Sequence, residues 1–350
     1  MCCIMINNLM NTTGKQSGHG KYDRRDFLKT LGVAWLGMTC GSGLLTACGP
    51  KPQGAETFIA KASDYSIDIG TLIRAGFREL KVDEAEIKGK RILLKPNLIE
   101  PPKGAIHVVT HPGVVRAAAE AFLNLGAAQV IVAEGPGHCR DTYMILEESG
   151  YYDIFSDRRI TFVDLNYDEW WTVPNAGRAT KMKSFVLPIT LKQVDWIVSM
   201  PKLKTHHWTG VTLSMKNLFG TLPGMFYGWP KNVLHMAGIN EAIIDINYTL
   251  RPHFAIVDGI VGMEGDGPIM GTPKKAGVVV MGRNLPAVDA TCTRLMGIDP
   301  NKIKYLSAAN NKLGPIKESF ILQRGEELKI VKTDFQLLEH IHAYRGLRLT

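Results

Sequence analysis

The chain has 350 residues, of which 45% are hydrophobic and 21% are charged, a composition typical of globular proteins and unlike that of a disordered chain. The formal net charge is +8, but residues 1–47 carry five cations and two acids, so the remainder of the chain has a charge of +5. This excess is not gathered into a basic stripe and no nucleic-acid-binding module is visible, which argues against nucleic acid as a partner.

Residues 1–47 are predicted to be a signal peptide. Asp23–Lys29 contains two adjacent arginines, and the apolar stretch Leu31–Leu45 that follows is short for a membrane span, so the segment resembles a twin-arginine export signal. Leu45–Cys48 is similar to the lipobox at which bacterial lipoprotein signals are cut and acylated. We expect export by the twin-arginine machinery to the periplasm or cell exterior, with a lipid on Cys48 as the membrane anchor. An uncleaved anchor helix is the alternative.

Cysteine usage limits the cofactors. Three cysteines precede the cleavage point and Cys48 is the expected lipid site, so Cys139 and Cys292 remain in the mature chain. Two thiols cannot hold a four-cysteine iron-sulfur cluster or zinc site, although they could pair in an oxidising compartment. Because the twin-arginine route carries folded proteins, often with a cofactor already inserted, a bound metal ion or organic group is favoured.

The elements then alternate in chain order. Residues 48–60 are predicted to be a tether, and residues 61–350 a single α/β domain. Apolar spacing of three and four predicts helices, and short apolar runs predict strands. Thr110–Pro112 is typical of a helix start, and Asp141 can cap the next helix. The expected elements of this half are strands at 91–95, 129–133, 160–165 and 195–200, with helices at 69–80, 110–123 and 141–150.

The second half continues the pattern less regularly. A turn between 173 and 184 predicts an inserted hairpin, and Leu222–Pro230 is either a mobile lid or a plain surface loop. Strands are expected at 255–258 and 277–282, helices at 239–250 and 284–296, and a final hairpin around Arg324–Gly325. Together the elements predict a mostly parallel sheet flanked by helices, in the Rossmann-like, doubly wound arrangement, with long active-site loops.

Cationic side chains gather after the strand that ends at Met200. Lys202, Lys204 and His206 follow it directly, and open α/β sheets place their ligands at the carboxyl ends of strands. Helical spacing after Gly210 predicts a helix that places Lys216 close to the same loop and adds backbone N–H donors. Solvated loop lysines are the structural alternative to a binding site.

Several lysines without an equal set of acids predict an anionic ligand. Lys95, Lys202, Lys204 and Lys216 come from three strand ends, and a carboxylate or phosphate would relieve their repulsion. A lysine among other cations also loses its proton more easily, which favours Lys204 as a general base or carbonyl-attacking amine. The alternative is a divalent metal ion bound by histidines and carboxylates, for which the candidates are His111, His206, His235, Glu264 and Asp258.

The order of several motifs resembles that of the domain of unknown function 362 family. These motifs are Leu94–Asn97, Thr110–Pro112, Pro201–His206, Met215–Gly220, Val257–Gly259, Glu264–Pro268 and Ala287–Asp289, and the resemblance implies a family core at about 90–300. The resemblance implies no settled reaction, but it places recurrent polar residues at Asn97, Asn217, Asp245 and Asp289 beside the lysines and histidines above. Some members carry ferredoxin-like cysteine clusters, which this chain lacks.

Two functions follow from these residues. The first is an exported enzyme for a small anionic molecule, with or without a metal ion, and the second is a lipid-anchored protein that binds such a molecule without changing it. The expected catalytic residues are Lys202, Lys204 and His206, the expected substrate-binding residues are Lys95, Asn97, His111, Lys216 and Asn217, and the expected metal ligands are His235, Asp258 and Glu264. Nicotinamide and nucleoside triphosphates are disfavoured because neither glycine-rich phosphate loop is present.

Overall fold

The structure is a computed structural model that describes residues 54–99, 104–138 and 141–349. The expected signal peptide 1–47, the lipid site Cys48 and the first part of the expected tether lie outside the described residues, as does Cys139. Cys292 is a buried free thiol. Ala55–Lys61 forms strand β1, so the expected tether is wrong from residue 55, because this run is buried between β11 and β12.

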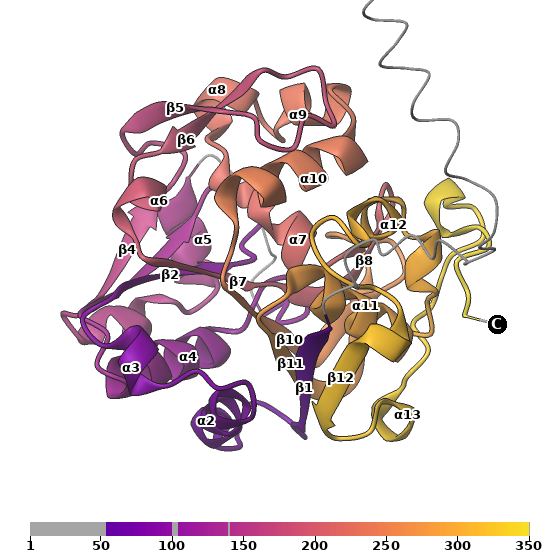
Figure 1. Ribbon diagram of the computed structural model, residues 1–350, viewed down its shortest axis with the longest axis horizontal. Coiled ribbons are helices and arrows are strands. Elements are labelled where there is room, and N and C mark those ends of the chain that lie inside the picture. Colours follow the sequence, from indigo (N-terminus) through magenta and orange to yellow (C-terminus); the bar gives the residue numbers. More distant parts are fainter. Residues whose placement is uncertain (1–53, 100–103, 139–140, 350) are drawn as a thin grey trace, which may run out of the picture. The chain divides into compact units, whose positions relative to one another are not determined.

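In the described part of the chain, ten strands form one mixed sheet in the order β12-β1-β11-β10-β7-β2-β3-β4, with β8 beside β10 and β9 beside β8. The pairs β10–β7, β7–β2, β2–β3 and β3–β4 are parallel, which confirms the predicted α/β fold (Figure 1). The remaining strands are β2 (Arg91–Pro96), β3 (Gln129–Glu134), β4 (Ile160–Asp164), β7 (Trp196–Met200), β8 (Lys202–His206), β9 (Gly210–Thr212), β10 (Phe254–Glu264), β11 (Thr272–Gly282) and β12 (Ile321–Gly325).

Helices cover both faces of this sheet. Leu93 of β2 packs in the core with α7, α10, α11 and α12, whereas Ile92 and Leu94 pack in a second core with α2 and α4. Side chains of a strand alternate between faces, so both faces of this central strand are buried. The α-helices are α2 (Ile69–Glu79), α3 (Glu84–Ile87), α4 (Pro112–Asn124), α5 (Thr142–Glu148), α6 (Thr190–Gln193), α7 (Ser214–Asn217), α8 (Gly224–Tyr227), α9 (Asn232–Met236), α10 (Ile239–Leu250), α11 (Leu285–Leu295), α12 (Lys304–Ala309) and α13 (Leu328–Val331).

Local signals place several helix starts. His111 is the N-cap of α4, where its Nδ1 accepts a hydrogen bond from Gly113 N (3.1 Å) and Pro112 occupies the first turn. Asp141 caps α5 by accepting a hydrogen bond from Met144 N (3.0 Å). The helix starts predicted at Thr110–Pro112 and Asp141 are therefore confirmed. None of the helices in the described ranges has the length and apolar character that crossing a membrane requires.

Two hairpin predictions have opposite outcomes. The inserted hairpin is confirmed, because β5 (Trp170–Pro174) pairs antiparallel with β6 (Ser184–Pro188). The hairpin predicted around Arg324–Gly325 is wrong, because β12 instead pairs parallel with β1 at the edge of the large sheet. Strand-forming residues indicate that a segment is a strand, but they do not indicate which other strand of the sheet it pairs with.

The segment after β7 also differs from the prediction. Lys202–His206 is a strand rather than a loop, and the residues after Gly210 begin as strand β9, with Lys204 opposite Thr212 and His206 opposite Gly210. Helix α7 begins only at Ser214. The spacing of Val211, Met215 and Leu218 suggested a single helix. Val211 in fact lies on β9, whereas Met215 and Leu218 lie on the helical turns that follow, and all three side chains are buried in the same core.

Candidate active site

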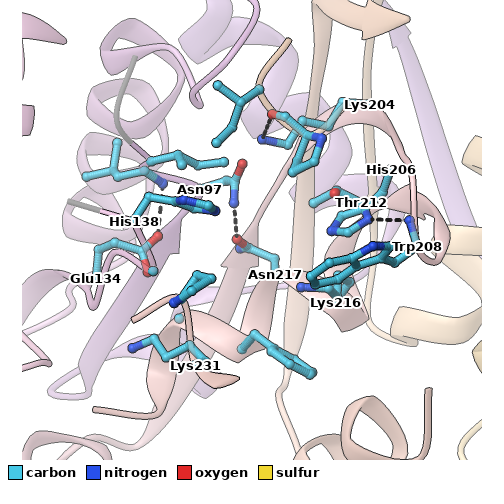
Figure 2. A pocket seen from close by; sticks show the side chains of 18 of the residues that line it. Asn97, Glu134, His138, Lys204, His206, Trp208, Thr212, Lys216, Asn217 and Lys231 are labelled. Carbon is cyan, nitrogen blue, oxygen red and sulfur yellow. Dashed lines mark hydrogen bonds between the residues drawn. The ribbon is translucent and has the colours of Figure 1, made fainter. Parts of the chain in front are cut away.

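A cavity lies beyond the carboxyl ends of the central strands. From β2 the sheet grows through β3 to β4 on one side, and the chain then returns to β7 on the other side of β2. Open α/β sheets bind ligands outside the strand ends at such a reversal. The cavity has a volume of about 320 Å³ and is lined by residues of β2, β3, β8, α7 and α9 (Figure 2). We call it the cationic cavity.

Seven of the expected polar residues line the cationic cavity. They are Lys95, Asn97, Lys204, His206, Lys216, Asn217 and His235. Six of them lie on β2, β8, α7 and α9, and Asn97 directly follows β2. Lys95 and His235 are 140 positions apart in the chain, and the fold brings all seven residues to one cavity. The structure thus gathers these residues, while the roles assigned to them stay predictions.

The floor of the cationic cavity is a buried ion pair between Lys95 and Glu134. Lys95 Nζ donates to Glu134 Oε2 (2.6 Å), to the carbonyl oxygen of Pro96 (2.7 Å) and to Asn217 Oδ1 (3.2 Å). Burial lowers the pKa of Lys95, and the charge of Glu134 opposes that shift. Because all three ammonium hydrogens already have acceptors, Lys95 serves to build the floor.

Glycine lets the backbone approach this pair. Glu134 also accepts hydrogen bonds from Leu98 N and Gly135 N, each at 2.9 Å. A Cβ atom at Gly220 would overlap the Glu134 carboxylate and lie 2.6 Å from Lys95 Nζ. The glycine that ends the motif Met215–Gly220 is therefore needed for the close contact between the 3-10 helix Leu218–Thr221 and the ends of β2 and β3.

Lys204 is fully buried without a carboxylate partner in the described ranges. Its Nζ donates to the carbonyl oxygens of Val108 (3.0 Å) and Pro268 (3.2 Å). Burial, followed by the charges of Lys202 and Lys216, lowers the pKa of Lys204 well below its usual value. A neutral amine has two hydrogens and one lone pair, so the two carbonyls use both hydrogens and leave the lone pair available.

Lys216 lies on α7 at the same cavity. Its Nζ is 4.1 Å from the centroid of the Phe219 ring, and no described residue accepts a hydrogen bond from it. Burial, and then the charge of Lys95, lowers the pKa of Lys216 to about 7. The amine is therefore present in both protonation states near neutral pH.

Two neutral histidines complete the polar lining. Trp208 N–H donates to His206 Nδ1 (3.1 Å), which leaves the hydrogen of the neutral ring on Nε2. His235 Nδ1 lies 3.1 Å from the carbonyl oxygen of Lys231, so this nitrogen carries the hydrogen and Nε2 has the lone pair. Burial lowers the pKa of His206 well below its usual value and that of His235 to about 4, and in both cases the charge of Lys216 is the largest neighbouring contribution. One ring can donate a hydrogen bond and the other can accept a proton.

Sequence reasoning missed several residues of the cationic cavity, among them Glu134, His138, Trp208 and Lys231. Glu134 follows a predicted strand directly, which was a usable signal. Lys231 had none, because it follows the irregular stretch Leu222–Pro230. Its Nζ is buried and donates to Asn166 Oδ1 (2.9 Å) and to the carbonyl oxygen of Leu222.

The stretch Leu222–Pro230 forms part of a wall of the cavity. It contains helix α8, buries Leu222 and Tyr227 in the core, and brings Pro230 to the cavity lining. Met225 and Phe226 on the same stretch are exposed. The segment is thus a packed wall with a few exposed apolar side chains.

Lys202 and His111 lie in a different, partly buried cluster, which corrects the expectation that they join the same pocket. Lys202 Nζ donates to Asp258 Oδ2 (2.6 Å) and to Tyr65 Oη (2.9 Å). His111 N donates to the same carboxylate oxygen (2.9 Å), and the His111 ring stacks on Tyr65 with centroids 3.8 Å apart. Lys202 therefore forms an ion pair with Asp258 and does not line the cationic cavity, because a buried charge needs an opposite charge beside it.

The expected metal ligands are not assembled. Asp258 belongs to the Lys202 cluster, Glu264 accepts a hydrogen bond from Gln336 N (2.8 Å) and lies 3.4 Å from Lys274 Nζ, and His235 lines the cationic cavity. No group of three or more histidine, cysteine or carboxylate side chains with metal-binding geometry occurs within 54–99, 104–138 and 141–349. The metal site was predicted only from the presence of histidines and carboxylates in the sequence. In the structure, tertiary contacts hold His235, Asp258 and Glu264 in different places.

Two acids at motif positions are structural. Asp289 on α11 accepts hydrogen bonds from Ser214 N (2.8 Å) and Met215 N (3.0 Å), so it caps α7 across the core. Asp245 accepts hydrogen bonds from Ala179 N (2.6 Å) and Thr180 N (2.8 Å) in the turn of the inserted hairpin. Each therefore holds a loop in place.

The fold and site define an α/β protein with a cationic cavity at the carboxyl edge of its sheet. Residues 92–294 match the family described as a domain of unknown function (DUF362), and this range covers more than half of the chain. The chain therefore belongs to the DUF362 family, over nearly the range expected from its motifs.

Individual proteins similar to this chain have low sequence identity to it. The thylakoid-associated protein sll1697 of Synechocystis sp. is 28% identical over 234 residues, which cover 65% of this chain and 68% of that protein. A structural-genomics protein from Thermotoga maritima shares 14% identity, with a TM-score of 0.39, over 64% of this chain and 58% of its own. The lactate racemase apoprotein from Thermoanaerobacterium thermosaccharolyticum shares 14% identity, with a TM-score of 0.40, over 70% and 57%. The match thus spans less than two thirds of either solved chain.

Proposed function

We propose that this protein is an exported, lipid-anchored enzyme that acts on a small molecule with a carboxylate or phosphate group. The observation that carries the proposal is that Lys204 and Lys216 share one cavity and that neither has a carboxylate partner in the described part of the chain. Lys95, in contrast, is neutralised by Glu134. A bound anion would supply the missing charge and favour the protonated forms of both amines.

Unsatisfied polar atoms in the cationic cavity support a ligand. Thr212 is 4% exposed, and its Oγ1 has no hydrogen-bond partner within the described ranges; the same holds for Asn97 Oδ1. Both residues line the cavity (Figure 2). Buried polar atoms are rarely left without a partner, so a ligand that offers an acceptor to Thr212 and a donor to Asn97 fits here.

The neutral histidines provide proton transfer. His206 Nε2–H can donate a hydrogen bond to oxygen, and His235 Nε2 can accept a proton, so the two rings can act on a molecule held by the lysines. Lys204 and His206 are the chain's main candidates for catalysis, with Lys216 in place of Lys202. The apolar side of the cavity, with Ile99, Phe219 and Ile269, fits a short hydrocarbon portion of the ligand.

The proposed location rests on the first 48 residues of the sequence. Two adjacent arginines before an apolar stretch and a lipobox ending at Cys48 support twin-arginine export and lipid attachment, on the periplasmic or outer face of a membrane. The Synechocystis relative is named as thylakoid-associated, which agrees with a protein held at a membrane.

Calorimetric titration of the purified protein with lactate, pyruvate and phosphate would test the proposal. At least one of these anions is expected to bind saturably, and Lys204→Met is expected to weaken that binding, whereas Lys329→Met, which alters a lysine with an 80% exposed side chain, is not. Equal affinities of both variants would place the site elsewhere. Binding without turnover of any anion in the panel would favour the lipid-anchored binding protein over the enzyme.

A further inference from the structure

We propose that Lys216 forms a covalent imine with a substrate that carries a carbonyl group beside its anionic group, as in a 2-oxo acid. This inference rests on the proposed function, because the anion is held by the same cavity. It adds the substrate class and the residue that bonds to it.

Lys216 differs from the other lysines of the cationic cavity in what its amine contacts. Lys95, Lys204 and Lys231 each donate hydrogen bonds to fixed oxygen atoms. Lys216 Nζ has only the face of Phe219 at 4.1 Å and no hydrogen-bond acceptor among the described residues. An amine without a fixed acceptor can turn its lone pair toward a ligand.

The surroundings keep this amine unprotonated for part of the time. Lys95, Lys204, Lys231, His206, His207 and His235 line the same cavity as Lys216. Of the acids in this lining, Glu134 is bound to Lys95, and Asp266 lies 3.4 Å from His207 Nδ1. Burial, and then the charge of Lys95, lowers the pKa of Lys216 to about 7, so a nucleophilic amine is present at neutral pH.

The groups needed for imine formation line the same cavity. The neutral Nζ attacks the carbonyl carbon, a C–N bond forms, and the carbonyl electron pair moves to oxygen, where His206 Nε2–H and the Thr212 hydroxyl can donate hydrogen bonds. His235 Nε2 then carries the two amine hydrogens in turn to that oxygen. The C–O bond breaks and water leaves, so one amine and one carbonyl give one imine and one water without any change of oxidation state.

Lys204 has a separate part in this arrangement. It enters the cavity from β8, whereas Lys216 enters from α7, and its two carbonyl partners fix the position of its nitrogen. A protonated Lys204 would use its third hydrogen to hold the carboxylate of the substrate. The carboxylate and the reacting carbonyl of a 2-oxo acid are adjacent, which suits two amines in one cavity.

Borohydride trapping tests the imine. The protein is incubated with pyruvate or glyoxylate, reduced with sodium borohydride so that any imine becomes a stable secondary amine, and analysed by intact mass and peptide mapping. We expect one adduct at Lys216, a yield that rises as the pH passes about 7, and competition by lactate, which has the carboxylate but no carbonyl. Lys216→Arg, which keeps the positive charge, is expected to lose the adduct, and Lys329→Arg is expected to retain it.

The outcomes separate the two proposals. Adducts spread over exposed lysines such as Lys329, or saturable binding of pyruvate with no adduct at Lys216, would overturn the imine and leave the anion site standing. Absence of both binding and adduct would overturn the proposed function together with the imine. An adduct that moves to Lys204 would reject Lys216 as the nucleophile.

Discussion

Lys202 and Lys204 are two positions apart on β8, yet Lys202 Nζ lies 2.6 Å from Asp258 Oδ2, whereas Lys204 donates only to the carbonyl oxygens of Val108 and Pro268. Both side chains are fully buried. The first lysine is therefore part of a structural ion pair, and the second is a buried amine without an anionic partner, whose protonation a bound anion would favour. This division separates stability from ligand binding within one short strand.

Substitution of these two lysines should have opposite effects. Lys202→Met leaves Asp258 buried without its cation, so we expect a loss of roughly 3–5 kcal/mol in the free energy of unfolding with little change in anion affinity. Lys204→Met should cost less stability but weaken anion binding roughly tenfold to a hundredfold, the value of a hydrogen bond to a charged group. Urea unfolding and calorimetry on the same samples measure both quantities. Similar losses of stability in the two variants would show that their roles are not divided in this way.

The buried pair Lys95–Glu134 should be stabilising in its context. Glu134→Gln removes the carboxylate that Lys95, Leu98 N and Gly135 N contact, and we expect a loss of about 3–5 kcal/mol in the free energy of unfolding. Glu120→Gln is the control, because Glu120 forms an ion pair with Arg116 in which both side chains are 52% exposed; its effect should stay within about 0.5 kcal/mol. Equal effects of the two substitutions would contradict the buried position of Glu134.

Gly220 should tolerate no side chain. Gly220→Ala would push a methyl group against Glu134 and Lys95, and we expect a cost of roughly 1–3 kcal/mol from overpacking together with weaker ligand binding. Gly54→Ala is the matched control, because the nearest atom to its added Cβ is 3.6 Å away. Thermal unfolding compares the two, and an unchanged Gly220→Ala variant would mean that the 3-10 helix Leu218–Thr221 does not approach the floor so closely.

The pH dependence of stability should carry a signature of Lys216. Its pKa is about 7 in the folded chain and about 10.4 when unfolded, so between these values the unfolded state binds more protons. Lys216 therefore contributes a rise in the free energy of unfolding from about pH 7 toward pH 10.4, and Lys216→Met should reduce that slope. Lys231, whose pKa is also lowered to about 7, contributes in the same direction and remains in the variant.

Ligand binding should show the opposite trend. An anion binds the protonated amine more tightly, so the stabilisation by phosphate should be larger at about pH 6 than at about pH 9. Thermal unfolding with and without phosphate at both values measures the difference. A phosphate effect independent of pH in this range would argue against Lys216 as an anion contact.

Export and anchoring make their own prediction. Radiolabelled fatty acid should be incorporated into the wild-type protein and lost in Cys48→Ser, while Cys292→Ser, which alters a buried thiol, should keep the label. Arg24→Lys combined with Arg25→Lys should leave the precursor inside the cell, as measured by fractionation. Label that persists in Cys48→Ser would place the lipid elsewhere.

The sequence alone was informative about local structure. Apolar spacing predicted α2, α4 and α10, the residues His111 and Asp141 marked helix starts, and a turn between two short apolar runs predicted the β5–β6 hairpin. These features depend on residues within a few positions of each other. Motif order likewise sufficed to recognise the DUF362 family.

Only the tertiary structure distinguished the charged residues that form structural ion pairs from those that line the cavity. Lys202 and Lys204 are alike in sequence, and what separates them is Asp258, 56 positions from Lys202 and brought to it by the pairing of β8 with β10. Contacts between residues far apart in the chain also place Glu134 and Lys231 in the lining of the cavity. A contact of the same kind, with Gln336, holds Glu264 outside it. Residue type and spacing determine which charged side chains exist and which element carries each of them. The order of strands in the sheet determines which charged groups become neighbours, and burial at that position determines the pKa of each group.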